Sequence, residues 1–224
     1  MKFLKPLHLS LVQHHIKGLV KKEIVNYAKG NVLDIGCGEK PFYIDIQKQI
    51  IRYIGLDHPG TEHQKENIDV FGIAKYLPFK NESFDMVLLT QVIEHLEDPQ
   101  KALYETYRIL KQNGILIISW PFLYPVHEAP RDFYRYTDFG MKHLATQAGF
   151  IVKSLVPVSG FWITFFSFLS MYIFRKSKLI YLFFLPILLL FKWLCILFNK
   201  LDVNSHSKWT WNFYAVLKKE NICD

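Results

Sequence analysis

A glycine-rich turn early in the chain carries the residues best suited to hold a ligand. The segment VLDIGCGEKPF, residues 32–42, begins as a short apolar strand that brings Asp34 to its carboxyl end. Gly36 and Gly38 then allow a tight turn, so that a ligand can approach main-chain N–H groups. Asp57 follows about twenty residues later, where a carboxylate can accept hydrogen bonds from both hydroxyls of a ribose. The third glycine of a dinucleotide fingerprint is missing, which favours a nucleoside with an amino-acid tail.

A second group of reactive side chains lies in the segment WPFLYPVHEAPRDFYRYT, residues 120–137. Its candidate substrate-contacting residues are Tyr124, His127, Glu128, Arg131, Tyr134 and Arg135. We predict His127 as the general base for a hydroxyl acceptor, because an imidazole has an unperturbed pKa of roughly 6.5. The two arginines are suited to clamping a carboxylate or phosphate of the substrate. His95 is a second histidine candidate near the site, and the alternative for the whole segment is a structural loop closed by Arg–Asp pairs.

The elements that must position these residues alternate between apolar strands and amphipathic helices. Strands are predicted at residues 31–36, 52–58, 67–70, 83–91, 115–121, 150–158 and 209–219. Helices are predicted at residues 9–29, at 98–110 with Asn113-Gly114 as its stop, and at 137–148 with Thr137 as its cap. Such alternation favours a mostly parallel sheet covered by helices on both faces.

A hydrophobic insert interrupts this pattern between the last two predicted strands. The stretches 155–174 and 179–198 each reach the length of about 20 apolar residues that a bilayer span requires. Both strands are predicted in one sheet, so the insert must return to the side of the membrane from which it started. Two crossings would place the basic segment RKSK, residues 175–178, on the opposite side, against the tendency of basic residues to stay on the cytoplasmic side. An interfacial hairpin avoids this conflict. A helical cap packed on the core or on a second subunit is the alternative.

Charge and cysteine content narrow the cellular setting. The formal net charge is +7, and lysines flank the hydrophobic stretches, which favours a membrane surface over nucleic acid. Three widely separated cysteines without a CxxC pattern predict neither a disulfide framework nor a structural zinc site, and no metal is predicted elsewhere. The first residues lack a signal-peptide core, so we expect a cytoplasmic location, peripheral or monotopic at the inner face of the cell membrane.

Several of these segments, in combination, resemble a known family. The segments VLDIGCG, GLDH, LPFKNESFDMVLLTQVIEHLEDP, YETYRILKQNGILIISWP and QAGF look like those of class I S-adenosylmethionine-dependent methyltransferases of the small-molecule, type 11-like kind. The resemblance covers residues 32–150 and the terminal strand near 213–218. It implies an α/β, Rossmann-like, doubly wound, mostly parallel seven-stranded sheet, here with a hydrophobic helical insert before the last strand.

The resemblance also implies which residues hold the cofactor, S-adenosylmethionine. Asp34, Gly36 and Gly38 would surround its methionine part, and Asp57 its ribose. Thr90 and Gln91, at the end of the fourth strand, would lie near the sulfonium. The family usually has an acidic residue where this chain has Ile73, so adenine recognition would depend on backbone groups of Ile73 and Ala74.

We therefore predict a methyltransferase that acts on a small or lipid-linked acceptor, at oxygen, at or near the membrane surface. The predicted organisation is an N-terminal helical cap (1–30), the cofactor-binding core (31–157), the membrane-seeking insert (158–202) and the final strand with a tail (203–224). Membrane contact is predicted through 158–200, oligomerisation through the insert is open, and no nucleic-acid partner is expected. The alternative is a non-catalytic, membrane-associated scaffold with a degenerate cofactor fold.

Overall fold

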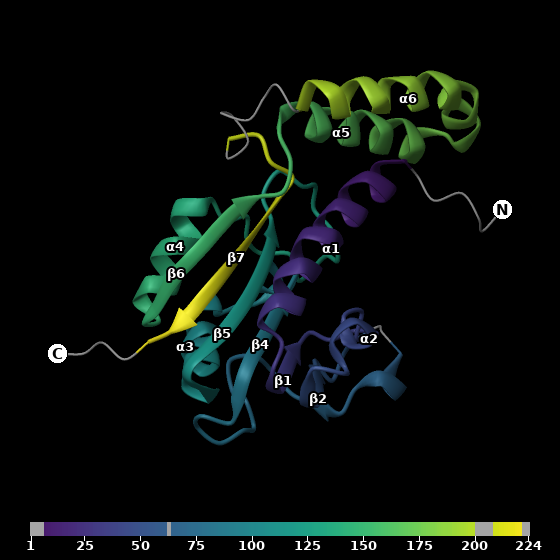
Figure 1. The fold of residues 1–224 in the computed structure, drawn as a ribbon. Coiled ribbons are helices and arrows are strands. Elements are labelled where there is room, and N and C mark those ends of the chain that lie inside the picture. The colour runs from purple at the N-terminus through teal and green to yellow at the C-terminus, as the bar shows by residue number, and fades with distance from the viewer. Residues whose placement is uncertain (1–6, 62–63, 200–207, 221–224) are drawn as a thin grey trace. The chain divides into compact units, whose positions relative to one another are not determined.

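The computed structural model describes residues 7–61, 64–199 and 208–220, and Figure 1 shows its elements. The first half contains α1 (Leu7–Tyr27), β1 (Gly30–Ile35), α2 (Tyr43–Ile46), β2 (Ile50–Asp57), the 3₁₀ turn η1 (Lys65–Asn67), β3 (Val70–Phe71), β4 (Phe84–Thr90) and the 3₁₀ turn η2 (Ile93–His95). The second half contains α3 (Pro99–Ile109), β5 (Leu110–Pro121), α4 (Asp138–Gln147), β6 (Phe150–Pro157), α5 (Phe161–Lys176), α6 (Lys178–Asn199) and β7 (Asn212–Lys219). Parts of the predicted cap, insert and tail (1–6, 200–207 and 221–224) lie outside the described residues.

Seven strands form one sheet in the order β3-β2-β1-β4-β5-β7-β6. The pairs β1/β2, β1/β4, β2/β3 and β4/β5 are parallel, and Figure 1 shows β7 running opposite to β6. Figure 1 also shows the second half of α1 on one face of the sheet and α3 and α4 on the other. The predicted α/β, mostly parallel seven-stranded sheet is confirmed.

The central strands are apolar on both faces, as a sheet covered by helices requires. Leu33, Val87, Leu88 and Ile117 are fully buried, and the register pairs Leu33 with Val87 and Leu88 with Ile117. This packing fixes the carboxyl ends of β1, β4 and β5 at one edge of the sheet. Loops that follow these three strands therefore leave from neighbouring positions.

Helix boundaries follow the predicted capping residues, with one exception. Asp98 accepts a hydrogen bond from the Lys101 backbone N–H at 3.0 Å, and Thr137 caps α4 in the same way. The predicted helix stop at Asn113-Gly114 is wrong, because α3 already ends at Ile109 and β5 begins at the next residue. Asn113, with a positive φ of 62°, instead lies in a bulge of β5, where the pairing with β4 jumps from Phe84–Leu110 to Met86–Ile115.

The described residues cluster into two compact units. The first holds α1 up to Leu19, Phe122–Tyr124, α5, α6, and the adjoining ends of β6 and β7. The second holds the rest of α1, residues up to Pro121, Pro125–Leu155 and β7 from Tyr214. All predicted site residues except Tyr124 belong to the second unit.

Within the first unit, α5 and α6 form a helical hairpin (Figure 1). Its base is closed by a buried hydroxyl group, because Thr210 Oγ1 accepts hydrogen bonds from the backbone N–H groups of Val158 and Ser159, both at 3.0 Å. The Val158 N–H also donates to the Asn212 carbonyl oxygen at 2.9 Å. The chain thus enters and leaves the hairpin at one point.

Candidate active site

The turn after β1 needs glycine at its first position. Gly36 has a φ of +69°, and its N–H donates to the Leu56 carbonyl oxygen at 2.8 Å. A Cβ on Gly36 would lie 2.3 Å from Cγ2 of Val92, which follows β4. Gly38 also has a positive φ, of 49°. The missing side chains let the backbone pass close to β2 and to the end of β4.

Asp34 is a buried carboxylate with an unsatisfied oxygen. Its Oδ2 accepts a hydrogen bond from the Tyr53 hydroxyl at 2.6 Å, and its Oδ1 has no hydrogen-bond partner among the described residues. Burial raises the pKa of Asp34 to about 7; the Tyr53 hydrogen bond opposes this rise, and repulsion by Asp57 adds to it. Asp34 is thus ready to accept a hydrogen bond from a cationic donor.

Asp57 is fixed at the end of β2 by two backbone donors. The Gly38 N–H donates to its Oδ2 at 3.0 Å, and the His58 N–H donates to its Oδ1 at 2.7 Å. Because each carboxylate oxygen can accept more than one hydrogen bond, Asp57 keeps capacity for hydroxyl donors while its orientation is set. This arrangement is compatible with the predicted role of Asp57 at a ribose.

Three supporting residues were not predicted from the sequence. They are Tyr53, which holds Asp34, and the ion pair of Lys40 and Asp69, whose Nζ and Oδ2 are 2.6 Å apart. Asp69 also accepts a hydrogen bond from the Gly55 N–H at 2.7 Å, which ties the segment after η1 to β2. The sequence signal for Tyr53 was a hydroxyl-bearing side chain in the strand that ends at Asp57.

The predicted adenine loop follows β3. The Ile73 carbonyl oxygen accepts a hydrogen bond from the Tyr76 N–H at 3.0 Å, and Ala74 is buried. One lone pair of the Ile73 carbonyl oxygen is therefore already used by the hydrogen bond from Tyr76. Position 73, where the family usually has an acidic residue, is an isoleucine in this chain. Adenine contacts by Ile73 and Ala74 stay a prediction.

Thr90 and Gln91 lie where β4 ends, beside β5. Thr90 pairs with Ser119, and the Gln91 side chain donates to the Ser119 hydroxyl at 3.1 Å. Gln91 has a positive φ of 56°, a conformation that marks a sharp change in chain direction at this edge. The two residues lie at the carboxyl end of β4, on the edge of the sheet where the sequence predicts the cofactor.

The loop after β5 is organised around one ion pair. The Arg135 guanidinium donates to both oxygens of Asp132, at 2.6 Å each, and this pairing holds the pKa of Asp132 well below its usual range. Asp132 also accepts from the His127 N–H at 2.8 Å and lies 3.2 Å from His127 Nδ1. Arg135 thus fixes the shape of the loop, and its predicted contact with the substrate stays a prediction.

His127 and His95 meet at the end of β4. Their ring centroids are 4.8 Å apart, and both rings approach the carboxylate of Glu94, whose side chain is fully buried. Burial lowers the pKa of His127 and raises that of Glu94 to about 8. Glu94 was missed in the sequence, although an acidic residue in the apolar context VIEHL was a signal for it.

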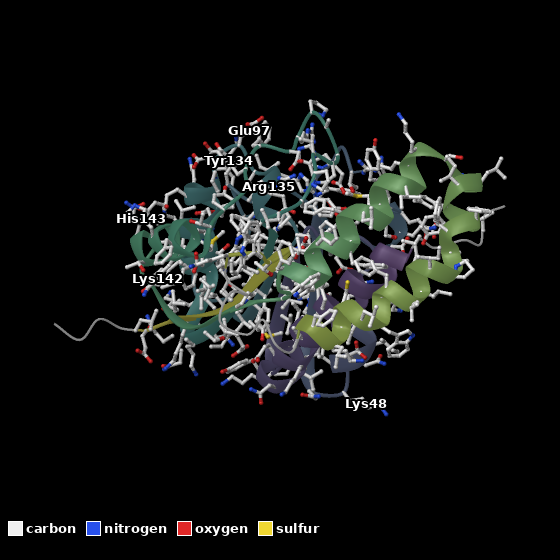
Figure 2. The ribbon with its side chains drawn as sticks, turned by 90° about the horizontal axis from the view of Figure 1, so that it is seen from above. Lys48, Glu97, Tyr134, Arg135, Lys142 and His143 are labelled. Atoms are coloured by element: carbon white, nitrogen blue, oxygen red, sulfur yellow. The ribbon has the colours of Figure 1, made fainter. Side chains whose placement is uncertain are left out.

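The other predicted substrate residues differ in their positions. Arg131 is exposed, and its Nη1 lies 3.1 Å from His58 Nδ1, which links the loop to the residue after Asp57. Glu128 is exposed, with Oε2 3.6 Å from His95 Nε2. Tyr134 is exposed beside Glu97, to whose carbonyl oxygen it donates at 3.3 Å (Figure 2). Tyr124 belongs to the first unit, where its ring packs on Trp211.

Known proteins share both the sequence and the fold of this region. A family model described as a methyltransferase domain matches residues 33–118. The uncharacterized methyltransferase YcgJ of Bacillus subtilis is 31% identical over 128 residues, which cover 51% of this chain and 47% of YcgJ. A probable S-adenosylmethionine-dependent methyltransferase of Mycolicibacterium smegmatis is 33% identical over 99 residues, 41% of this chain and 38% of the relative.

The chain contains a class I methyltransferase domain. A solved putative methyltransferase from Bacillus halodurans has the same fold, with a TM-score of 0.57 at 16% identity over 93% of this chain and 100% of that one. The chain spans less than half the length of the two curated relatives above. The methyltransferase domain is of the S-adenosylmethionine-dependent kind, which makes S-adenosylmethionine its cofactor.

The residues of the methyltransferase domain fit this cofactor. The unsatisfied Oδ1 of Asp34 suits an ammonium donor, the positive-φ turn at Gly36 brings the backbone against Val92 after β4, and Asp57 suits the ribose hydroxyls. All three lie at the carboxyl ends of β1 and β2, the edge at which open α/β sheets bind ligands.

Proposed function

We propose that this chain transfers the methyl group of S-adenosylmethionine to an oxygen of a small or lipid-linked acceptor at the inner face of the cell membrane. The observation that carries the proposal is the unsatisfied, buried Oδ1 of Asp34 beside the fixed carboxylate of Asp57. The cofactor supplies an electrophilic methyl group on a sulfonium. The residues of the chain bind it, orient the acceptor and exclude water.

Two carboxylates would orient the cofactor from opposite ends. Asp34 would accept a hydrogen bond from its ammonium group, and Asp57 would accept from its ribose hydroxyls. Both carboxylates are held before binding, Asp34 by Tyr53 and Asp57 by backbone N–H groups. Such preorganisation lowers the entropy cost of binding.

The acceptor would lie between the end of β4 and the loop after β5. Methyl transfer is an in-line displacement at carbon, so the protein mainly needs to position and desolvate the acceptor. Exposed Tyr134 and Arg131 offer an aromatic surface and a cationic donor for it. That His127 acts as base for a hydroxyl acceptor stays a prediction, supported by its position at the end of β4 beside Glu94.

Calorimetric titration of the detergent-purified chain with S-adenosylhomocysteine tests the cofactor site. We expect micromolar binding, weakened at least tenfold, about 1.4 kcal/mol, by Asp57→Ala. Asp138→Ala, in the first turn of α4, is a matched control that should leave the affinity unchanged. A folded sample that gives no heat at high ligand concentration would favour the non-catalytic scaffold instead.

The membrane location is supported by the surface of α6. Among the described residues, one helix, Lys178–Phe198, is long and apolar enough to cross a membrane by length and composition, and only 17% of that window is buried. Its exposed side chains include Phe183, Ile187, Leu190 and Trp193. An exposed apolar surface of this kind marks an interaction site.

The hairpin fits a bilayer surface better than a double crossing. The 16 residues of α5 extend about 24 Å, which is short of the hydrocarbon core of about 30 Å. The basic residues Arg175, Lys176 and Lys178 lie where α5 joins α6, a position suited to anionic headgroups but not to translocation. We propose that the apolar surface of α6 lies in the interface of an anionic bilayer.

Flotation with phosphatidylglycerol-containing vesicles tests this location. Replacing Phe183, Leu190 and Trp193 together by serine should lower the bound fraction at least tenfold, because burying each large apolar side chain contributes about 1.5–3 kcal/mol. A control triple replacement by serine at Ile44, Ile51 and Phe139, which are equally exposed in the second unit, should bind like the parent. A parent protein that does not bind vesicles but dimerises through α6 would contradict the membrane location. The exposed surface of α6 would then be an interface between two copies of this chain.

A further inference from the structure

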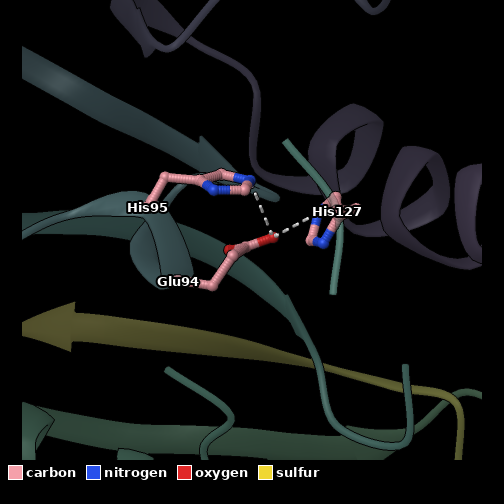
Figure 3. A group of neighbouring side chains, drawn as sticks. All are labelled: Glu94, His95 and His127. Atoms are coloured by element: carbon pink, nitrogen blue, oxygen red, sulfur yellow. Dashed lines mark ion pairs between the residues drawn. The ribbon is translucent and has the colours of Figure 1, made fainter. Parts of the chain in front are cut away.

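Three potential metal ligands converge where β4 ends. Glu94 and His95 lie in η2, His127 lies in the loop after β5, and one ligand atom from each lies within 4.8 Å of the others (Figure 3). Glu94 is fully buried, and neither of its carboxylate oxygens has a hydrogen-bond partner among the described residues. Burying a carboxylate in this way is costly unless a cation or proton compensates it.

The hydrogen bonds of both histidines direct a lone pair toward Glu94. His95 Nδ1 lies 2.6 Å from the Arg131 carbonyl oxygen, which can only accept, so this nitrogen carries the hydrogen. His127 Nδ1 lies 3.2 Å from the Asp132 carboxylate, also an acceptor. In these tautomers each Nε2 carries a lone pair, and the two Nε2 atoms lie 3.7 and 3.9 Å from Glu94 Oε1.

Arg135 does not reverse the tautomer of His127. Its Nη2 lies 3.4 Å from His127 Nδ1. This contact is longer than the two other hydrogen bonds that Nη2 donates, to Asp132 Oδ2 at 2.6 Å and to the Pro125 carbonyl oxygen at 3.1 Å, and longer than the 3.2 Å contact of His127 Nδ1 with Asp132. The donor in the contact between His127 and Asp132 is therefore the imidazole.

We propose that Glu94, His95 and His127 together bind one divalent first-row transition-metal ion such as Zn²⁺, Mn²⁺ or Fe²⁺. Two imidazole nitrogens and a carboxylate are a ligand set for these metals, more than for Mg²⁺ or Ca²⁺. A ligating histidine usually donates its other N–H to a carboxylate or a carbonyl oxygen, as His127 does to Asp132 and His95 does to Arg131.

The spacing of the three side chains suits one ion. Ligands about 2.1 Å from a tetrahedral ion are about 3.4 Å apart. The two histidine nitrogens lie 3.7 and 3.9 Å from Glu94 Oε1, and all three ligand atoms lie within 4.8 Å of one another, so binding one ion requires the side chains to close in. Glu128 Oε2, 3.6 Å from His95 Nε2, is available as a fourth ligand from an exposed side chain. An acceptor hydroxyl on such an ion would lose its proton more readily, which would replace the predicted role of His127 as base.

Metal titration of the chelator-treated, detergent-purified chain tests the proposal. We expect one Co²⁺ or Zn²⁺ per chain, with a dissociation constant of about 1 µM or lower by calorimetry, and a visible d–d absorption band for Co²⁺. His95→Ala, His127→Ala and the isosteric Glu94→Gln should each weaken binding at least tenfold. His143→Ala, which removes an exposed imidazole on α4 (Figure 2), should leave it unchanged.

Two results would overturn the metal site. One is a parent protein that does not bind Co²⁺, Zn²⁺ or Mn²⁺ saturably. The buried carboxyl group of Glu94 would then be neutralised by a proton instead of a metal ion. The other is a set of ligand variants that bind metal as the parent does. Titration of each variant with S-adenosylhomocysteine verifies its fold through a different group of residues, so loss of the metal site and loss of the cofactor site are distinguishable.

Discussion

S-adenosylhomocysteine is expected to bind about a hundredfold more weakly at about pH 5 than at pH 8, because Asp34 must lose its proton before it can pair with the ligand ammonium. Burial raises the pKa of this carboxyl to about 7 in the ligand-free protein. Below that pH each unit lowers the affinity about tenfold, since the ligand has to displace the proton. Calorimetric titration across this pH range measures the effect.

The same proton has the opposite effect on the ligand-free fold. The pKa of Asp34 is about 7 in the folded chain and about 3.9 in the unfolded chain. The stability that it contributes is therefore complete below about pH 4 and lost as the pH rises through 7. Asp34→Asn keeps an acceptor for Tyr53 but carries no charge. It should raise the free energy of unfolding at about pH 8, because no charge is then buried, while ligand binding at that pH weakens about a hundredfold.

Opposite changes in stability and binding are the distinguishing result for Asp34. Denaturant unfolding and calorimetry on one preparation provide both values. Glu66→Gln removes an exposed carboxylate and should change neither. An Asp34→Asn variant that binds with the affinity and pH dependence of the parent would show that another group meets the ammonium.

Replacing Gly36 by alanine is expected to weaken S-adenosylhomocysteine binding at least a hundredfold, about 2.7 kcal/mol. The new Cβ would lie 2.3 Å from Val92 Cγ2, and the φ of +69° is unfavourable for any residue with a side chain. A β-branched side chain such as Val92 has little freedom to move away, so the turn itself has to shift.

A second substitution separates the steric effect from the backbone effect. Val92→Ala removes both methyl groups, and the remaining Val92 Cβ lies 3.4 Å from the new side chain, an ordinary contact. The double variant Gly36→Ala/Val92→Ala should therefore recover the part of the affinity lost to the clash and keep the loss due to the positive φ of residue 36. Gly18→Ala, where no atom lies within 4 Å of the added Cβ, serves as a control. An equal loss in the single and double variants would assign the effect to the backbone alone.

The sequence predicted the features that are encoded locally. The glycine turn, the aspartates at the ends of β1 and β2, and the caps Asp98 and Thr137 depend on short-range backbone chemistry, which one segment can show. The helix stop at Asn113 was wrong because a positive-φ asparagine fits a bulge in a strand as well as the end of a helix.

The chemistry of the candidate site was less accessible from the sequence. Glu94 meets His127 across more than thirty residues, and the Asp34–Tyr53 bond joins two neighbouring strands. Burial makes both carboxylates unusual, and burial is a product of packing that no local pattern displays. The loop after β5 contains the Arg–Asp pair, Arg135 with Asp132, that we expected of a purely structural loop. Residue spacing alone did not distinguish such a loop from one that binds substrate.

The hydrogen bonds that join the two ends of the α5–α6 hairpin, at Thr210 and Val158, have an evolutionary consequence. Val158 and Asn212 are hydrogen-bonded although 54 positions separate them, so everything between them begins and ends at one site. Lengthening a closed excursion costs little free energy, because the entropy of closure grows only with the logarithm of its length. Insertions and deletions in the helices can therefore accumulate without changing the strand order. We expect the segment between Val158 and Asn212 to differ in length and sequence among related proteins more than the sheet does.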